Sequence, residues 1–162
     1  MSKLRVLLDA NIVCAGCVWP RFPYEVLEHA IRGDYQMVLT QEIIEEAREA
    51  IAEIAPGRMR RLDAVLESSA YEEATTPTRQ EIAENAGLVR DIEDVHVALA
   101  AINSTVDFLI SLDRDLTDPA EPIHQKLKIL LPAAFLRHYM GWSSDDLEAI
   151  RHRTWDDLSD EE

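Results

Sequence analysis

The sequence predicts an α/β fold, a three-layer α/β/α sandwich with a central, mainly parallel sheet of about five short strands. Short apolar runs alternate along the chain with longer segments of helical periodicity, as expected for strands joined by crossover helices. The 162 residues, 47% of them hydrophobic, are enough for one sizeable core but not for a second full domain. We therefore expect one domain over residues 1–141, followed by an appendage over residues 142–162.

Each expected element has a local signal. Strands are expected at short runs that precede turn or cap residues: 4–8, 36–39, 71–76, 106–111 and 128–131, of which 71–76 is polar. Helices are expected over segments of helical periodicity or composition: 24–32, 41–54, 58–69, 78–85, 93–103 and 132–139. Thr40 and Pro132 are typical of helix starts, and Gly33 of a helix end. Residues 10–23 are expected to form a loop.

The charge balance restricts the class of protein. The chain has 31 acidic and 16 basic residues, and its net charge of −15 argues against a broad basic face for nucleic acid. Several carboxylates in one metal site would account for part of this acidity, because a bound cation inverts the local field. The first apolar run is too short for a signal peptide or a membrane span, so we expect a cytoplasmic protein without a membrane partner.

Cys14 and Cys17 are the only cysteines. A disulfide scaffold is not expected from two cysteines in a chain without an export signal. Their Cys-x-x-Cys spacing leaves a thioredoxin-like redox function as an alternative, but neither a helix start nor a supporting motif is evident beside them. A zinc site would need a further pair of cysteines or histidines. We expect both residues to be incidental to function.

Acidic residues follow two of the expected strands at the point where each strand ends. Asp9 follows the first strand and Asp113 the fourth. In open α/β sheets the functional crevice lies outside the carboxyl ends of the strands, so both acids should share one rim. Glu46, in the second turn of the helix after the second strand, and Asp94, in the first turn of an alanine-rich helix, could face the same crevice. We expect these four carboxylates to meet.

Four carboxylates a few ångströms apart could not all stay ionised without a counter-charge. A hard cation would resolve the conflict, and an all-oxygen ligand set favours Mg²⁺ or Mn²⁺ over zinc. Such a centre suits phosphodiester hydrolysis, in which the metal activates a water and stabilises the leaving oxygen. The candidate catalytic and metal-binding residues are therefore Asp9, Glu46, Asp94 and Asp113.

The sequence resembles the PIN domain family between Leu4 and Leu136. The resemblance is carried by five blocks in the family's order: VLLDANI, VLTQEIIEEAREAI, DIEDVHVALAA, FLISLDRDL and KILLPAAFL. It implies a PIN-like fold and a metal-dependent ribonuclease that cleaves RNA, often the toxin half of a bacterial toxin–antitoxin pair. The same four acids would form its centre. A small antitoxin protein and a homodimer are the partners that we expect besides RNA.

Further residues are expected around this centre. Supporting roles are assigned to Asn11, Thr40, Ser111 and Asp115. Contacts with RNA phosphates are expected from Arg58, Arg60, Arg61 and Arg114. His96 is expected to be packed or solvated, because it lies two residues after Asp94 and so on another face of the helix.

Each candidate acid also has a structural interpretation. Asp9 and Asp113 could simply cap the turns that follow their strands. Glu46 competes with its neighbours Glu42, Glu45 and Glu49, which could form a solvated helix face. Asp94 lies beside Asp91 and Glu93, and first turns of helices attract acids through the helix dipole.

The acidic appendage should also be partly helical. It holds eight acids and two arginines, and Ser143 is placed to cap a short helix that carries Leu147 and Ile150. So short a helix is marginal alone, so it should dock on its own domain, a second copy or a partner, unless it is a disordered, solubilising end. Its acids could repel RNA or lie over the basic residues at positions 58–61.

Other functions fit less well. A Rossmann oxidoreductase would need a glycine-rich turn after the first strand, and a P-loop NTPase a Gly-Lys-Ser or Gly-Lys-Thr sequence, and the chain has neither. An aspartyl phosphatase would usually place a second Asp where this chain has Asn11. A non-catalytic PIN-like module that binds RNA or protein remains the main alternative, although the complete acid set argues against it.

Overall fold

The structure, a computed structural model, describes residues 3–159. Its five strands form one sheet in the order β3-β2-β1-β4-β5, and all four neighbouring pairs are parallel. The strands are β1 (Arg5–Leu8), β2 (Gln36–Leu39), β3 (Glu72–Glu73), β4 (Phe108–Ile110) and β5 (Ile129–Leu130). The predicted α/β fold is therefore confirmed. The edge strands β3 and β5 have only two residues each, fewer than the sequence predicts.

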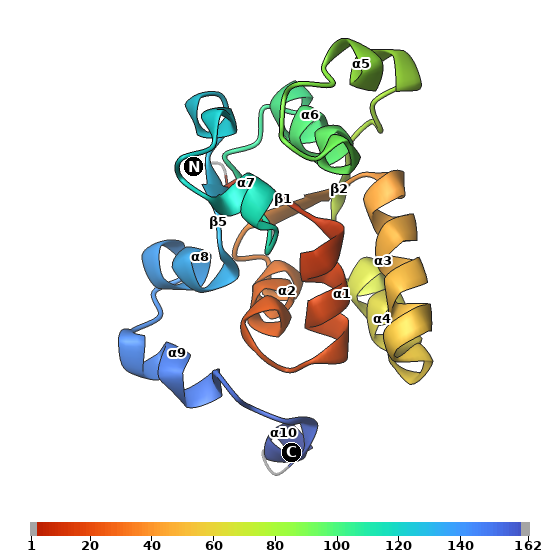
Figure 1. The fold of residues 1–162 in the computed structure, drawn as a ribbon. Coiled ribbons are helices and arrows are strands. Elements are labelled where there is room, and N and C mark those ends of the chain that lie inside the picture. The colour runs from red at the N-terminus through yellow and green to blue at the C-terminus, as the bar shows by residue number, and fades with distance from the viewer. Residues whose placement is uncertain (1–2, 160–162) are drawn as a thin grey trace.

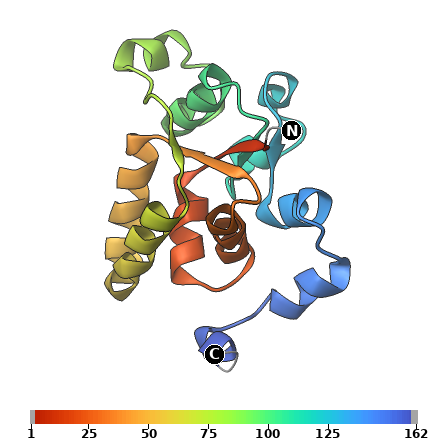
Figure 2. The ribbon, with the colours of Figure 1, turned by 180° about the vertical axis from the view of Figure 1, so that it is seen from behind.

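Helices cover both faces of this sheet. In Figures 1 and 2, α1, α2, α3 and α4 lie on one side and α5 and α6 on the other. The α-helices are α1 (Ala10–Val18), α2 (Phe22–Arg32), α3 (Gln41–Ile54), α4 (Met59–Ser68), α5 (Arg79–Glu84), α6 (Val95–Asn103), α7 (Arg114–Thr117), α8 (Pro132–Tyr139), α9 (Ser144–Ile150) and α10 (Trp155–Ser159). Three 3-10 turns are η1 (Pro56–Arg58), η2 (Ile92–Asp94) and η3 (Pro122–Gln125). Among the described residues, no helix is both long and apolar enough to cross a membrane.

Helix α1 replaces the loop expected over residues 10–23, and it places Cys14 and Cys17 in a helix. Its residues are almost all apolar and buried, so it lacks the polar stripe by which an amphipathic helix is recognised. Gly16 does not break it. A Cβ atom there would lie 2.5 Å from Leu27 Cδ1 and 2.9 Å from the Pro23 carbonyl oxygen, so glycine is required for the close packing of α1 against α2.

The cysteines are buried free thiols within this helix. Burial raises the pKa of the Cys14 thiol, and it raises the pKa of Cys17 to about 12. A reactive cysteine needs the opposite change, a lowered pKa in an accessible position. The redox alternative therefore has no support from the geometry of Cys14 and Cys17.

The register of the central strands determines what lies at their carboxyl ends. Leu8 of β1 pairs with Ile110 of β4, so Asp9 and Ser111 follow at the same level of the sheet. The Asp9 backbone N–H donates to the Ile110 carbonyl oxygen at 3.0 Å. Buried side chains such as Leu7 and Leu109 hold this register, each contributing about 1.5–3 kcal/mol by leaving water.

The C-terminal segment docks on its own domain. The Ser143 hydroxyl caps α9, as expected, by accepting from the Asp146 N–H at 3.0 Å. The indole Nε1–H of Trp142 donates to His29 Nε2 at 2.9 Å, and that of Trp155 to the Val18 carbonyl oxygen at 2.9 Å. The segment therefore contacts the end of α1 and the last turn of α2.

Arg153 anchors the same segment through a buried ion pair. Its guanidinium lies 2.9 Å from a Glu25 carboxylate oxygen, and the two side chains are only 13% and 9% exposed. Its Nε–H also donates to the Pro20 carbonyl oxygen at 2.7 Å. Of the basic residues at positions 58–61, Arg58 meets this segment through the ring face of Trp155, at 4.2 Å. That contact is with an aromatic ring rather than with an acid of the appendage.

Candidate active site

Asp9 lies at the centre of the candidate site and is buried, with 5% of its surface exposed. One carboxylate oxygen caps α1 by accepting from the Ala10 N–H at 2.7 Å. The other accepts from the Ser111 hydroxyl at 2.7 Å. Burial raises the pKa of Asp9 although both hydrogen bonds lower it. The capping role is thus present, and the second oxygen is held by Ser111.

Ser111 links Asp9 to Asp113. Its hydroxyl, fully buried, donates to Asp9 and accepts from the Asp113 N–H at 3.0 Å. Asp113 in turn caps α7 by accepting from the Asp115 N–H at 2.9 Å. Asn11 Nδ2 lies 3.4 Å from Asp9 and from the Ser111 hydroxyl, and its Oδ1 accepts from the Leu112 N–H at 3.2 Å. The expected supporting residues Asn11 and Ser111 therefore contact the candidate acids.

Asp94 faces Asp113 and completes the inner cluster. Burial raises the pKa of Asp94 to about 8, and a hydrogen bond with Asp113 and the charges of Asp113, Asp9 and Asp91 act in the same direction. Its Oδ2 is buried and has no hydrogen-bond partner among the described residues. Without a cation, the cluster therefore retains a proton more readily than an isolated carboxylate does.

Asp91 and Asp115 extend the cluster beyond the acids chosen from the sequence. Among residues 3–159, Asp91, Asp94 and Asp115 each offer one carboxylate oxygen that lies within 4.8 Å of the other two. We expected Asp115 to play a supporting role and attributed Asp91 to the helix start. Asp91 could have been found from its position three residues before Asp94, because residues at this spacing share one side of a helical turn.

Glu46 lies on the other side of Asp9 and is paired with His96. The His96 Nε2 is 2.6 Å from a Glu46 carboxylate oxygen, and the imidazole is only 11% exposed. The charge of Glu46 also reaches Asp9, whose pKa it raises. Burial lowers the pKa of His96, but the hydrogen bond to Glu46 and nearby acid charges outweigh it, and the net shift is upward.

His96 is packed, as expected, but it lies beside the candidate acids rather than away from them. We placed it away from the acids by applying helical periodicity from Asp94. However, Asp94 belongs to the 3-10 turn η2, and regular helix begins only at Val95. The angular relation between residues two apart in an α-helix does not hold across that boundary. His96 therefore belongs to the site.

Thr40 supports the site by fixing the start of the helix that carries Glu46. Its hydroxyl is buried and accepts from the Ile43 N–H at 3.1 Å, which caps α3. It thereby determines where α3 begins and places Glu46 in the second turn.

The expected basic contacts are not beside the acids, apart from Arg114. Arg58, Arg60 and Arg61 follow the end of α3, whereas Glu46 lies near its beginning. Arg61 is paired with Glu28 and lies 4.4 Å over the Tyr24 ring. Arg114 is exposed at the start of α7, directly after Asp113.

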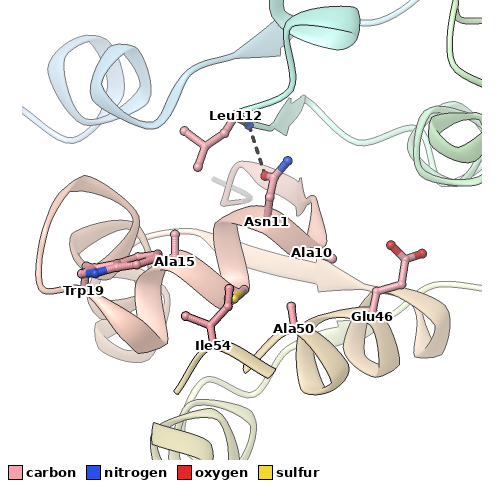
Figure 3. A pocket seen from close by; sticks show the side chains of 9 residues that line it. Ala10, Asn11, Ala15, Trp19, Glu46, Ala50, Ile54 and Leu112 are labelled. Atoms are coloured by element: carbon pink, nitrogen blue, oxygen red, sulfur yellow. Dashed lines mark hydrogen bonds between the residues drawn. The ribbon is translucent and has the colours of Figure 1, made fainter. Parts of the chain in front are cut away.

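An apolar groove of about 410 Å³ adjoins the acids (Figure 3). It runs along α1 and α3 and is lined by Ala10, Asn11, Cys14, Ala15, Trp19, Glu46, Ala50, Ile54 and Leu112. Asn11 and Glu46 belong to both the groove and the acidic site. The large apolar side chains Trp19, Ile54 and Leu112 are 42%, 54% and 43% exposed. A second hollow of about 260 Å³ lies beyond Trp19 and includes Arg21 and Arg151.

The acidic residues fit a hard divalent cation. The site offers carboxylate oxygens, which such cations prefer, and an unpartnered buried oxygen on Asp94. A cation would also offset the burial and the acid charges that raise the pKa of Asp94. Asp94, Asp91 and Asp115 are grouped closely enough to hold one ion.

Comparisons with known proteins agree with this description. The crystal structure of PAE2754 from Pyrobaculum aerophilum matches with a TM-score of 0.58 and 20% identity, over 83% of this chain and 88% of that chain. At this identity the likeness shows a shared fold. No curated protein matches the chain. A family model described as PIN domain matches residues 5–115, more than half of the sequence. The chain therefore belongs to the PIN domain family, whose members are generally metal-dependent nucleases.

Proposed function

We propose that this protein is a ribonuclease that hydrolyses RNA phosphodiester bonds with Mg²⁺ or Mn²⁺ as its cofactor. The observation that carries the proposal is the state of Asp94. Its pKa is raised to about 8, and one of its buried oxygens has no partner among residues 3–159. A structural carboxylate would normally be paired or solvated. The unpartnered buried oxygen of Asp94 is therefore available to bind a cation.

The remaining residues hold the acids in place. Ser111 and the Ala10 N–H fix the Asp9 carboxylate, and His96 holds Glu46. When bound, a divalent cation lowers the pKa of an attacking water and stabilises the leaving oxygen. Asp9, Glu46, Asp94 and Asp113 supply the negative charge that retains the cation. Asp91 and Asp115 join them as ligand candidates.

The test is cleavage of labelled single-stranded and structured RNA by the purified chain in Mg²⁺ or Mn²⁺. EDTA should abolish cleavage, and Asp9→Asn and Asp94→Asn should each lower the rate by ~10²-fold or more. Asp145→Asn, which changes an exposed acid of α9, is the matched control and should cleave normally. Full activity of a folded Asp9→Asn, Asp94→Asn double variant would refute the proposal. DNA of the same sequence tests the preference for RNA.

We also propose that the ribonuclease is the toxin of a toxin–antitoxin pair in the cytoplasm, neutralised by a small antitoxin protein. The support is the resemblance of the five sequence blocks to the PIN domain family, whose members are often such toxins. Induced expression should then arrest growth of the host cell, and Asp94→Asn should remove the effect. Normal growth at confirmed expression of the active chain would instead favour a stand-alone ribonuclease.

A further inference from the structure

We infer that the groove between α1 and α3 binds an unpaired nucleotide a few positions from the scissile bond, its base against Trp19 and the next phosphate near Arg21 and Arg151. The inference rests on the proposed function, because the acidic site must hold a phosphodiester. It adds a binding site for one unpaired base and a residue that positions that base.

The groove leads directly out of the acidic site. Asn11, which contacts Asp9 and Ser111, lines its wall, and so does Glu46. Trp19 follows the last residue of α1, so it lies roughly 15 Å from Asp9 at the helical rise of about 1.5 Å per residue. Figure 3 shows Trp19 and Glu46 at opposite ends of the groove. An RNA strand held at the acids would reach Trp19 within a few nucleotides.

The other exit from the site is less suitable for RNA. A neighbouring hollow on the α6 side is lined by Glu42, Glu46, Ile82, Ile92, Glu93 and His96. Its three glutamates would repel the phosphates of a strand. The groove along α1 contains a single acid, Glu46, at the end that touches the site. A strand leaving the acids is therefore directed along the apolar groove.

The chemistry of the groove suits a base rather than a phosphate. Apart from Asn11 and Glu46 its lining is apolar or weakly polar, and its volume falls within the range of small-ligand pockets. An aromatic ring binds any base through its π-face, so such a platform works in a chain whose net charge of −15 weakens attraction for phosphates. Stacking would supply affinity that electrostatics cannot.

Positive charge appears where the next phosphate would lie. The hollow beyond Trp19 is lined by Arg21 and Arg151 together with Phe22 and Leu112. Arg151 is half-exposed, and each guanidinium has more donors than its protein partners use. An apolar groove followed by two arginines complements a nucleotide better than it complements a basic peptide, which the arginines would repel.

Trp19 is held in position before any ligand binds. The backbone N–H of Trp19 donates to the Ala15 carbonyl oxygen at 2.9 Å, and the Trp19 carbonyl oxygen accepts from the Arg21 backbone N–H at 3.0 Å. The preceding residue, Val18, is held by Trp155 of the C-terminal segment. A backbone that is already ordered at this position loses little entropy on binding.

The test measures cleavage and binding of a single-stranded RNA oligonucleotide by the full chain in Mn²⁺. Trp19→Ala should lower kcat/KM and binding by about 5- to 100-fold, the range expected for one stacked base. Trp19→Phe should retain most of both. Arg151→Gln should weaken binding. It should also reduce the slope of log K against log[salt] by ~0.7, the value expected for the loss of one phosphate contact. Arg79→Gln removes the same charge on the far side of the sheet and should change neither.

A series of oligonucleotides with one abasic position then identifies the base. At one position a few nucleotides from the cleaved bond, the effects of losing the base and of Trp19→Ala on binding and cleavage should not be additive. Additive effects at every position, or unchanged binding and cleavage by folded Trp19→Ala, would overturn the inference and leave the groove to a protein segment. If RNA binds in a Trp19-dependent manner without being cleaved, the groove stands and the ribonuclease proposal fails.

Discussion

The imidazole of His96 lies 2.6 Å from the carboxylate of Glu46 and joins α6 to α3 across the candidate site. Metal-binding carboxylates are commonly oriented by such a partner, and removal of the partner typically costs 10- to 100-fold in metal affinity or activity. His96 is thus a positioning residue, since it acts through Glu46.

We expect His96→Ala to weaken Mn²⁺ binding by about 10- to 100-fold, measured by calorimetry or by electron paramagnetic resonance. His96→Gln keeps a donor and should recover part of the affinity. His138→Ala, at an exposed histidine of α8, is the control. Equal Mn²⁺ affinity of His96→Ala and the parent protein would contradict this role.

The raised pKa of Asp94 makes stability depend on pH when no divalent cation is bound. Its pKa rises from the ordinary 3.8 to about 8 in the folded state, so the folded chain holds a proton that the unfolded chain releases. The resulting stabilisation is complete below about pH 4 and is lost as the pH rises toward 8.

In EDTA, Asp94→Asn should therefore be more stable than the parent protein at pH 8, and the difference should shrink toward pH 4. Urea unfolding across this range measures it. Mg²⁺ should stabilise the parent protein at pH 8 and have much less effect on the variant, because ligands stabilise the state that binds them. A difference independent of pH would show that folding does not raise the pKa of Asp94.

Ser111→Ala should reduce both stability and activity. The buried hydroxyl donates to Asp9 and accepts from the Asp113 N–H, so its loss leaves buried polar groups unpaired at a cost of about 1–3 kcal/mol. Denaturant unfolding should show the loss, with Ser144→Ala at an exposed position of α9 as control. Cleavage should also slow, since Asp9 loses its orienting donor. Unaltered cleavage would mean that Ser111 serves the fold alone.

Arg153→Ala should destabilise the protein far more than Arg151→Ala does. Removal of Arg153 breaks a buried ion pair, which typically costs 3–5 kcal/mol, and leaves Glu25 with only the more distant Arg32 at 3.9 Å. Arg151 pairs with Glu148 at the surface, where the contribution is about 0–1 kcal/mol. Chemical unfolding of both variants makes the comparison. Similar small losses would indicate that the C-terminal segment is only loosely docked.

The elements with regular periodicity were predictable from the sequence. Helices α3 and α8 and strand β2 occupy the predicted residues, because apolar spacing, Thr40 and Pro132 mark them clearly. Helix α1 was missed, because a helix buried on all sides has no polar stripe to reveal its period. Its apolar sequence and its glycine could equally describe a loop.

The site was predictable in outline for a similar reason. The ends of the first and fourth strands locate Asp9 and Asp113 without knowledge of packing. The positions of His96 and Asp91 depend instead on where η2 gives way to α6, a boundary that composition does not reveal. The groove could not be predicted from the sequence either, because it forms only where α1 and α3 lie side by side.

The sheet ends at both edges in strands of two residues, and one of them, β3, consists of Glu72 and Glu73. Such short and charged edges offer little template for an added strand. Self-association by extension of the sheet is therefore disfavoured, as is edge-to-edge aggregation. If the expected homodimer forms, its two copies should meet through helices.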